Sequence, residues 1–479
     1  MIFFKKLLFA LTVVVSVSTV SSQSSSTLNL DRRYDEVSWL INHNAYQNPE
    51  INASDNGLTG GLNQAHSVNT QLNNGGRSFM IDLQYGRTTN FFKGRFLRLG
   101  HGPAGFAYWM EMCDFLSKIN NFLNNNKNEI ITLHMQIDNG VTVNHIKDAF
   151  AGKGNRCSSS ANVMKYVYAH PNNLQVWPTL KKLINDNKRL IVLSEKDFGS
   201  SAPSWLHYEF KFTRQNDFAA NQVSELSQKH RFEIAGNPGR GNNKTSLLTI
   251  NNFAVDAPLG VGDKSKAKDA NEYNRMYNKL IRSWFSFGKR PSMAVDFYEQ
   301  GNYSARNVMN EANRINEVRG RFKKADGSNF EDYVVVNSSL ESNWYIHGAK
   351  ARARLYYSFP ARPGEPRRIK FSHPNYNFTP QEINLTNYDG KNKRTFRVDV
   401  TVTPKNARRN IVSTVELKQN LDQKIDIQVY DFNGRLLLEL KNTKSLEENF
   451  SRINDLKTGV YIVRGFVDGK AYTKKIAIK

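Results

Sequence analysis

The chain has 479 residues, 39% of them hydrophobic, and a formal net charge of +23. This length is more than one ordinary domain needs and indicates roughly two to four domains. The charge favours anionic partners, but the basic residues form no long block and no nucleic-acid-binding motif accompanies them. We therefore expect an acidic membrane surface as the partner, and no nucleic acid.

Residues 1–22 have the pattern of a secretory signal peptide. Lys5 and Lys6 form a basic start, an apolar stretch covers 7–20, and small residues follow it. No later segment reaches the roughly 18 uninterrupted apolar residues that a membrane span requires. We expect the signal to be cleaved and the mature protein to work outside the cytoplasm.

The stretch from about 28 to 321 alternates apolar strands with amphipathic helices such as 112–124 and 272–287. This alternation is typical of parallel α/β architecture. It predicts a (β/α)8 TIM barrel over 23–322, with a long inserted loop at 152–178. The eight predicted strands are 37–43, 79–84, 96–101, 130–137, 189–194, 209–213, 246–253 and 292–297.

Two small all-β domains are predicted after the barrel. A helix near 308–318 is followed by alternating, turn-rich sequence, which indicates a sandwich-like module over 323–404, most economically a spacer. Short strands continue over 405–479. In this last part Asn433-Gly434 and Asp468-Gly469 are typical turns of two β-hairpins.

The last domain resembles a known sorting signal in the phrases VYDFNGRLL, LKTGVYIVR and TKKIAIK. These are similar to the C-terminal sorting domain of type IX secretion in Gram-negative bacteria. The resemblance implies export through the outer membrane by that machinery, to the medium or the cell surface. Without it, the same strands would suit one more β-sandwich module.

The chain has only two cysteines, Cys113 and Cys157, which is too few for a disulfide scaffold. In an oxidising compartment they can form one bridge within the first domain. Two buried free thiols fit the sequence equally well.

Two histidines stand at the ends of predicted strands. His43 lies in VSWLINHNAY and His101 in FLRLGHGP. Because an imidazole titrates near neutrality, such a pair can act as general base and general acid across one phosphodiester, although a strand-end histidine is more often structural. Asp296 ends the last predicted strand, which lies beside the first in a closed barrel, so we expect it to orient His43.

Polar residues also follow two inner strands of the predicted barrel. Asp82 and Gln84 share one face of their strand, and Thr132, His134 and Gln136 share one face of the next. Because a carboxylate that points into a barrel needs a partner or a function, we expect these faces to line the interior.

The first domain resembles the X-domain of phosphatidylinositol-specific phospholipase C in its bacterial, single-domain form. The resemblance covers roughly 31–308 and rests on NHNAY, QLNNGGRSFMIDL, LGHGP, NNKNEIITLHMQ, KRLIVLSEKD, LLTINNF and RPSMAVDFYEQG. It implies a distorted (β/α)8 TIM barrel. It also implies a phosphatidylinositol diacylglycerol-lyase, in which the inositol 2-hydroxyl attacks phosphorus to give diacylglycerol and inositol 1,2-cyclic phosphate. By motif, His43 would be the base, Asp296 its orienting carboxylate, His101 the acid and Asp82 the residue that assists the acid.

The chain departs from that family at Gln84, where metal-independent bacterial enzymes carry arginine and calcium-dependent relatives a carboxylate. Calcium is possible through Asn44, Asp82 and Gln136, but this set has one anionic ligand, so we favour no metal. The cation that stabilises the phosphate is then unassigned, with Arg87 and Arg98 as candidates.

Headgroup recognition departs from the family as well. Glu195 stands where a bacterial relative offers an arginine to the inositol hydroxyls, which suggests an altered substrate preference. Gln84 and Gln136 are further candidates for substrate binding. Tyr298, with Tyr46 and Phe297, would form an aromatic wall near the sugar, although core packing is the commoner role of such residues.

The sequence thus favours a secreted monomeric phospholipase C that attacks phosphatidylinositol or glycosylphosphatidylinositol anchors at a membrane surface. The first alternative is a related phosphodiesterase with another headgroup. The second is a surface adhesin or glycan-binding protein with a non-catalytic barrel.

Overall fold

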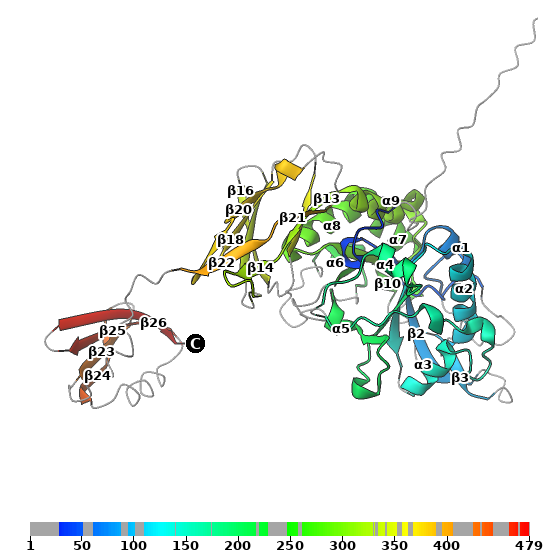
Figure 1. Cartoon of the computed structure of the whole chain (residues 1–479), viewed down its shortest axis with the longest axis horizontal. Coiled ribbons are helices and arrows are strands. Elements are labelled where there is room, and N and C mark those ends of the chain that lie inside the picture. The colour runs from blue at the N-terminus through cyan, green and yellow to red at the C-terminus, as the bar shows by residue number, and fades with distance from the viewer. Residues whose placement is uncertain are drawn as a thin grey trace, which may run out of the picture. The chain divides into compact units, whose positions relative to one another are not determined.

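The computed structural model forms two compact units, Met1–Thr403 and Pro404–Lys479 (Figure 1). The predicted signal peptide and His101 lie outside the residues that the structure describes. Those residues are 28–50, 61–87, 94–100, 110–138, 140–173, 175–216, 220–228, 247–256, 261–328, 330, 334–340, 343–351, 357–362, 367–388, 395–405, 425–431, 434–443, 459–467 and 470–478.

Eight parallel strands form the curled sheet of the first unit, in the order β7-β6-β5-β2-β1-β12-β9-β8. The two end strands are consecutive in the chain, joined only by the short helix α5 (Glu209–Phe212). The predicted barrel class is therefore confirmed, as a distorted barrel. The strands are β1 (Leu40–Asn42), β2 (Ser78–Gly86), β5 (Ile131–Ile137), β6 (Leu190–Ser194), β7 (Leu206–Tyr208), β8 (Thr213–Gln215), β9 (Leu247–Asn251) and β12 (Pro291–Val295).

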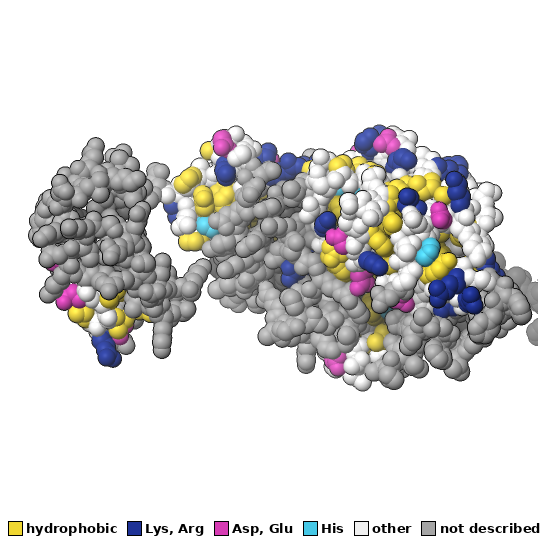
Figure 2. Space-filling model, turned by 90° about the horizontal axis from the view of Figure 1, so that it is seen from below, with side chains coloured by type: hydrophobic (Ala, Val, Ile, Leu, Met, Phe, Trp, Pro, Cys, Tyr) yellow, Lys and Arg dark blue, Asp and Glu magenta, His cyan; other side chains and the backbone are white. Residues whose placement is uncertain are grey.

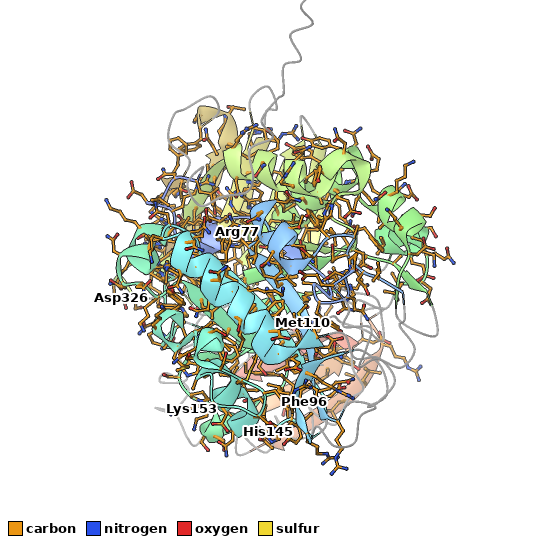
Figure 3. All side chains as sticks on the ribbon, turned by 90° about the vertical axis from the view of Figure 1, so that its right-hand side faces the viewer. Arg77, Phe96, Met110, His145, Lys153 and Asp326 are labelled. Atoms are coloured by element: carbon orange, nitrogen blue, oxygen red, sulfur yellow. A yellow bond between two sulfur atoms is a disulfide. The ribbon has the colours of Figure 1, made fainter. Side chains whose placement is uncertain are left out.

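One predicted barrel strand, 96–101, is wrong. Residues 96–99 form β3 (Phe96–Leu99), which runs antiparallel to β2 and also pairs with β4 (Met110–Glu111), off the barrel path. Figure 3 labels Phe96 and Met110 on these two strands. The connection from β2 is too short for the crossover of about a dozen residues that a parallel neighbour needs, so the chain folds straight back.

The predicted strand 209–213 is also wrong. Residues 209–212 form α5, and the strands are β7 before it and β8 after it. Glu209 is buried, and its carboxylate accepts a hydrogen bond from Gln215 and lies 2.7 Å from Nδ1 of His134 inside the barrel. These interior bonds account for a helical turn where the residue pattern suggests a strand.

Helices cover the outside of the barrel, with α2 and α3 beside β2 and β3 in Figure 1. The two helices predicted at 112–124 and 272–287 are confirmed as α2 and α8. The apolar face of α2 is buried, as its spacing of three and four residues predicts. The helices are α1 (Val68–Asn73), α2 (Met112–Asn125), α3 (Val143–Phe150), α4 (Leu180–Asn185), α6 (Val223–Gln228), α7 (Lys264–Ala270), α8 (Tyr273–Phe287) and α9 (Gln300–Arg314).

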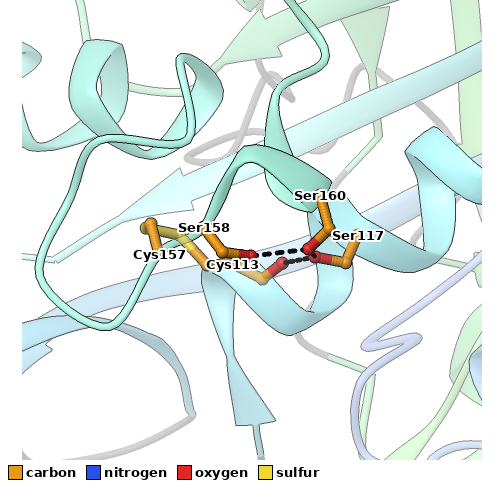
Figure 4. The surroundings of a disulfide bond; sticks show 5 residues. All are labelled: Cys113, Ser117, Cys157, Ser158 and Ser160. Carbon is orange, nitrogen blue, oxygen red and sulfur yellow. Dashed lines mark hydrogen bonds between the residues drawn. A yellow bond between two sulfur atoms is a disulfide. The ribbon is translucent and has the colours of Figure 1, made fainter.

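A disulfide joins Cys113 of α2 to Cys157 in the inserted loop, with the Cα atoms 5.2 Å apart (Figure 4). Of the two alternatives that the sequence leaves open, the structure has the bridge. Ser117 and Ser160 are hydrogen bonded at 2.9 Å beside it. The bridge and this bond hold the insertion against α2.

The middle β-module packs on the barrel within the first unit. Its strand β13 (Asn316–Gly320) lies within 23–322, the range that the sequence predicts for the barrel. It also begins within 308–318, where the sequence predicts a helix, so that prediction is wrong at its end. Trp284 of α8 donates to Ser358 of the module at 2.8 Å, and both elements share one apolar core. The remaining strands are β14 (Phe322–Lys324), β15 (Val334–Leu340), β16 (Asn343–Ala351), β17 (Tyr357–Ala361), β18 (Arg367–Ser372), β19 (Tyr376–Thr379), β20 (Glu382–Asn384), β21 (Thr395–Arg397) and β22 (Val400–Pro404).

These module strands form three small sheets, in the orders β17-β13-β21, β14-β22-β19 and β16-β15-β18-β20. The prediction of an all-β module after the barrel is confirmed in this form. Two further short strands of the first unit, β10 (Val255–Asp256) and β11 (Val261–Gly262), pair with each other near the barrel rim.

The second unit is one antiparallel sheet in the order β24-β23-β25-β26. Gly434 has a φ of +81°, as expected at the first predicted turn, while Asn433, Asp468 and Gly469 lie outside the described residues. The strands are β23 (Ile425–Tyr430), β24 (Leu436–Thr443), β25 (Gly459–Val467) and β26 (Lys470–Ile478).

Within the described ranges, no helix has the length and apolar character to cross a membrane. On the face drawn in Figure 2, the described Lys and Arg side chains lie in several small groups over the surface. This distribution agrees with the sequence, in which basic residues are spread rather than clustered.

Candidate active site

His43 and Asp296 meet at the carboxyl ends of two neighbouring strands. β1 pairs with β12 in parallel, and the two residues follow directly after these strands. His43 Nδ1 lies 2.8 Å from Asp296 Oδ1, and the side chains are 13% and 1% exposed. The predicted neighbourhood of the two residues is thus confirmed. A carboxylate so placed holds the Nδ1–H tautomer and leaves Nε2 of His43 as the proton acceptor.

The His43 ring is also held by an aromatic ring stacked on one of its faces. Phe253, after β9, stacks on it with the ring centroids 3.6 Å apart and the planes 6° from parallel. Phe253 is itself buried with Ile41 and Ala294. The imidazole therefore has its carboxylate on one edge and an aromatic ring on one face, and its freedom to rotate is small.

Asp82 is buried on the inner face of β2, where its carboxylate accepts a hydrogen bond from the Tyr46 hydroxyl at 3.0 Å. Burial, and next the Asp82 charge, raise the pKa of Tyr46, so this hydroxyl stays protonated and donates. Tyr46 is thus a partner of Asp82 rather than part of an aromatic wall. Gly100 donates its N–H to the Asp82 carbonyl at 3.1 Å, so the chain leading to His101 is anchored beside Asp82.

The other predicted polar residues end strands at the same side of the sheet. Gln84 is buried on β2, Gln136 is exposed at the end of β5 opposite Asp82, and Glu195 is half-buried after β6. Arg98 of β3 is buried and stands opposite Gln84 in the antiparallel register. Residues opposite each other in such a register share a face, so Arg98 lies on the same face as Gln84.

Tyr298 and Phe297, which the sequence suggests as contacts of the sugar, are buried in the protein instead. Tyr298 is fully buried, with its hydroxyl 2.9 Å from both Asn74 and His66, and burial raises its pKa. Phe297 is buried as well. Neither side chain offers surface to a sugar in this structure, because the chain after Asp296 turns into the core.

The proposed calcium ligands do not suit a resident calcium ion. Asn44 is buried and donates to Gln47 at 3.2 Å, and Asp82 already accepts the bond from Tyr46. Asp82 is the one anionic group of the set, whereas Ca²⁺ sites gain affinity from several carboxylates. The described part of the chain has no cluster of three or more His, Cys, Asp or Glu side chains arranged to hold a metal.

Below this layer, the barrel interior is polar, as the alternation in 131–137 predicts. His134 lies 3.0 Å from Ser78 and 2.7 Å from Glu209, and Thr132 lies 2.6 Å from the Tyr34 hydroxyl. Thr132 and His134 are buried, and each is hydrogen bonded to buried neighbours. Both side chains therefore have structural partners and offer no exposed surface to a substrate.

Sequence reasoning missed two residues of the site, Phe253 and Asn63. Asn63 Nδ2 donates to Asp296 Oδ1 at 2.9 Å. Both residues lie in non-repetitive segments, where no periodicity shows which way a side chain points. Phe253 ends the family-like stretch LLTINNF, whereas Asn63 lies outside the stretches that carry the resemblance.

Comparisons with known proteins assign two parts of the chain to families. A family model described as PI-PLC X 1 matches residues 30–310, and one described as Secretion system C-terminal sorting domain matches residues 404–479. Both resemblances seen in the sequence are thereby confirmed.

Two curated proteins are similar to this chain. PI-PLC X domain-containing protein 1 of Arthroderma benhamiae is 25% identical over 245 residues, covering 50% of this chain and 72% of that protein. A PI-PLC X domain-containing protein of Arabidopsis thaliana is 24% identical over 281 residues, covering 55% of this chain and 58% of its own length.

Two solved structures can be superposed on the first unit. The phosphatidylinositol-specific phospholipase C of Listeria monocytogenes covers 60% of this chain and 97% of its own, at 15% identity and a TM-score of 0.40. A variant of the Staphylococcus aureus enzyme covers 60% and 99%, at 12% identity and a TM-score of 0.40. TM-scores this low support no inference about function.

Proposed function

Because this chain belongs to the PI-PLC X 1 family over residues 30–310, we propose that it is a phospholipase C-like phosphodiesterase that cleaves phosphatidylinositol or glycosylphosphatidylinositol anchors. The observation that carries the proposal is the contact between His43 and Asp296 at the strand ends. It supplies a general base with a fixed tautomer, which a binding scaffold does not need.

In the proposed reaction, Nε2 of His43 takes the proton of the inositol 2-hydroxyl, whose oxygen attacks phosphorus. The bond from phosphorus to the glycerol oxygen breaks, and His101 gives that oxygen a proton. The products are diacylglycerol and inositol 1,2-cyclic phosphate. The step is proposed without a metal ion: acid and base are both side chains, and the charge on the phosphate is left to a cationic side chain.

We assign the cation that stabilises the phosphate to Arg98 rather than Arg87. Arg87 is exposed, whereas Arg98 is buried on the face of Gln84. A Cβ built on Gly86 would lie 3.0 Å from the Arg98 guanidinium, so Gly86 leaves the room that this group occupies. Arg98 would then bring to the site the charge that Gln84 lacks.

The sorting domain over 404–479 supports export by the type IX machinery, to the medium or the cell surface. There the substrate would be the lipid or anchor of another cell's membrane. The net charge of +23 would concentrate the protein on anionic bilayers.

The proposal is tested with a headgroup panel followed by phosphorus NMR, with and without chelator. We expect a cyclic phosphate from phosphatidylinositol that chelator does not abolish, and a loss of at least about 100-fold in His43→Ala and His101→Ala. His145→Ala, on α3 outside the barrel, is the matched control and should retain activity. Full turnover in His43→Ala would exclude the mechanism.

Gln84 and Glu195 favour a second candidate, a phosphodiesterase for another headgroup. The same panel decides between the two, because turnover of a different phospholipid in preference to phosphatidylinositol would select it. Glycan binding with no turnover of any phosphodiester would instead select the adhesin.

A further inference from the structure

We propose that Asn63 and Gln64 are positioning residues for the catalytic base: Gln64 sets the spacing of the two strand ends, and Asn63 holds the Asp296 carboxylate on the His43 ring. The role in catalysis rests on the proposed function. The geometry rests on hydrogen bonds between described residues. Neither Asn63 nor Gln64 belongs to the acid–base set assigned above.

Gln64 fixes the two strand ends relative to each other. Its Nε2 donates to the carbonyl of His43 at 2.8 Å and to the carbonyl of Val295, next to Asp296, at 3.1 Å. One fully buried amide thus spans β1 and β12 at the level of the catalytic residues. The spacing of the two backbones sets the distance between imidazole and carboxylate.

Asn63 acts on the side chains. It is fully buried, and its Nδ2 lies 2.9 Å from Asp296 Oδ1 and 3.5 Å from His43 Nδ1. Asp296 Oδ1 therefore accepts from two donors, while Oδ2 has no hydrogen-bond partner within the described part of the chain. The Asn63 backbone is anchored too, by bonds from its N–H to Gln47 and from Phe297 to its carbonyl, at 3.0 and 2.7 Å.

The shared oxygen gives Asn63 its effect. The carboxylate oxygen that contacts the ring is held by a second donor, so Asp296 cannot turn away from His43 without breaking its bond to Asn63. A carboxylate fixed in this way keeps the Nδ1–H tautomer of the ring and leaves Nε2 for the substrate proton. Asn63 thus positions the base through Asp296.

The packing around the amide is tight. A Cβ built on Gly262 of β11 would lie 2.8 Å from the Leu62 carbonyl and 3.0 Å from Asn63 Nδ2. A glycine at 262 is therefore required for Asn63 to reach Asp296. Gly262→Ala should displace the amide without changing any polar group of the site.

Among the described residues, few charged groups lie on the elements around His43. Asp296 follows β12 and bonds the ring, and Asp82 on β2 is engaged with Tyr46. Lys279 of α8 donates to the loop after β9, and Asp263 caps α7 after β11. The carboxylate that contacts the ring is Asp296, and Asn63 donates to the oxygen that makes the contact.

The test compares Asn63→Ala, Asn63→Asp and Gly262→Ala in the full chain. The value of kcat should fall by about 10-fold in Asn63→Ala and Gly262→Ala, and further in Asn63→Asp, which sets an acceptor against the carboxylate, while KM stays unchanged. An unchanged kcat, or a loss that falls on KM, would overturn the proposal.

An independent readout uses 15N-histidine NMR, which shows without turnover which ring nitrogen of His43 carries the proton. Wild type should show the Nδ1–H tautomer and the same three variants a mixture of the two tautomers, even if no substrate is found, so failure of the proposed function is distinguishable. Asn313→Ala is the matched control, since Asn313 is a buried amide bonded to the Ser38 backbone far from the site. If it moves His43 as much as Asn63→Ala does, Asn63 is only structural.

Discussion

At the scale of single residues, the protein fixes two of the proposed catalytic groups, His43 and Asp82, with partners that have no role in the chemistry. Phe253 stacks on His43, and Tyr46 donates to Asp82. Such support reduces the reorganisation that a reaction requires, because the groups are already in place. The same reasoning applies to Arg98, whose guanidinium lies against Gly86 and donates to the Arg87 carbonyl.

Replacement of Arg98 tests its assignment. We expect Arg98→Met to lower kcat/KM by about 100-fold to 1000-fold, mainly through kcat, because a charge that stabilises the transition state is lost. Arg87→Met, an exposed neighbour, is the control and should change little. Steady-state kinetics at constant pH, with thermal unfolding to verify folding, make the comparison. Equal effects in the two variants would contradict the assignment.

The buried His170 should make the stability of the protein depend on pH. It is buried, stacked on Trp177 with centroids 4.1 Å apart, and burial lowers its pKa to about 4. Because the folded value lies below the unfolded value of about 6.5, its contribution to stability is complete above that pH and is lost as the pH falls towards 4.

The free energy of unfolding should therefore fall by up to about 1.4 kcal/mol per pH unit in this window because of His170. His170→Gln should have a shallower slope. Urea denaturation at several pH values measures it. Parallel slopes for the two proteins would show that His170 does not titrate there.

At the scale of elements, local interruptions shape the barrel. α5 separates β7 from β8 and carries Glu209 inward to His134. The inserted loop is held by Cys157 to α2 across a separation of 44 residues. Both features place residues distant in the chain next to each other, one by a buried hydrogen bond and the other by a covalent bond.

Loss of the bridge should lower stability. Closing a loop of this length reduces the entropy of the unfolded chain, so a variant with alanine at both Cys113 and Cys157 should lose about 2–4 kcal/mol in its free energy of unfolding. Reduced wild-type protein should behave like the variant. Urea denaturation checks both, and a variant as stable as the oxidised protein would refute the expectation.

At the scale of the whole molecule, the β-module is a structural part of the catalytic unit. Arg319 of β13 is buried and bonds Asp35, ahead of β1, and Glu317. Arg290, just before β12, bonds the same Glu317 at 3.1 Å. Removing the module would leave these charges of the barrel buried without partners, which is strongly unfavourable.

Truncation tests this dependence. A chain that ends at residue 403 keeps the first unit intact and should retain the melting temperature and turnover of its barrel. A chain that ends at residue 314 loses Arg319 and the shared core, so we expect it to aggregate or melt at much lower temperature. In the full chain, Arg319→Met should cost about 3–5 kcal/mol. A stable, active 314-residue chain would show that the module is only a spacer.

The sequence by itself determined the barrel class, the all-β modules, the sorting domain and the neighbourhood of His43 and Asp296. Period-2 and helical patterns report burial along one element, and barrel closure then fixes which strands are neighbours. Tertiary structure alone decided that 96–99 folds back on β2, that Tyr298 is buried, and that Asn63 reaches Asp296. These outcomes depend on connection length and on packing between segments distant in the chain, neither of which leaves a period in the sequence.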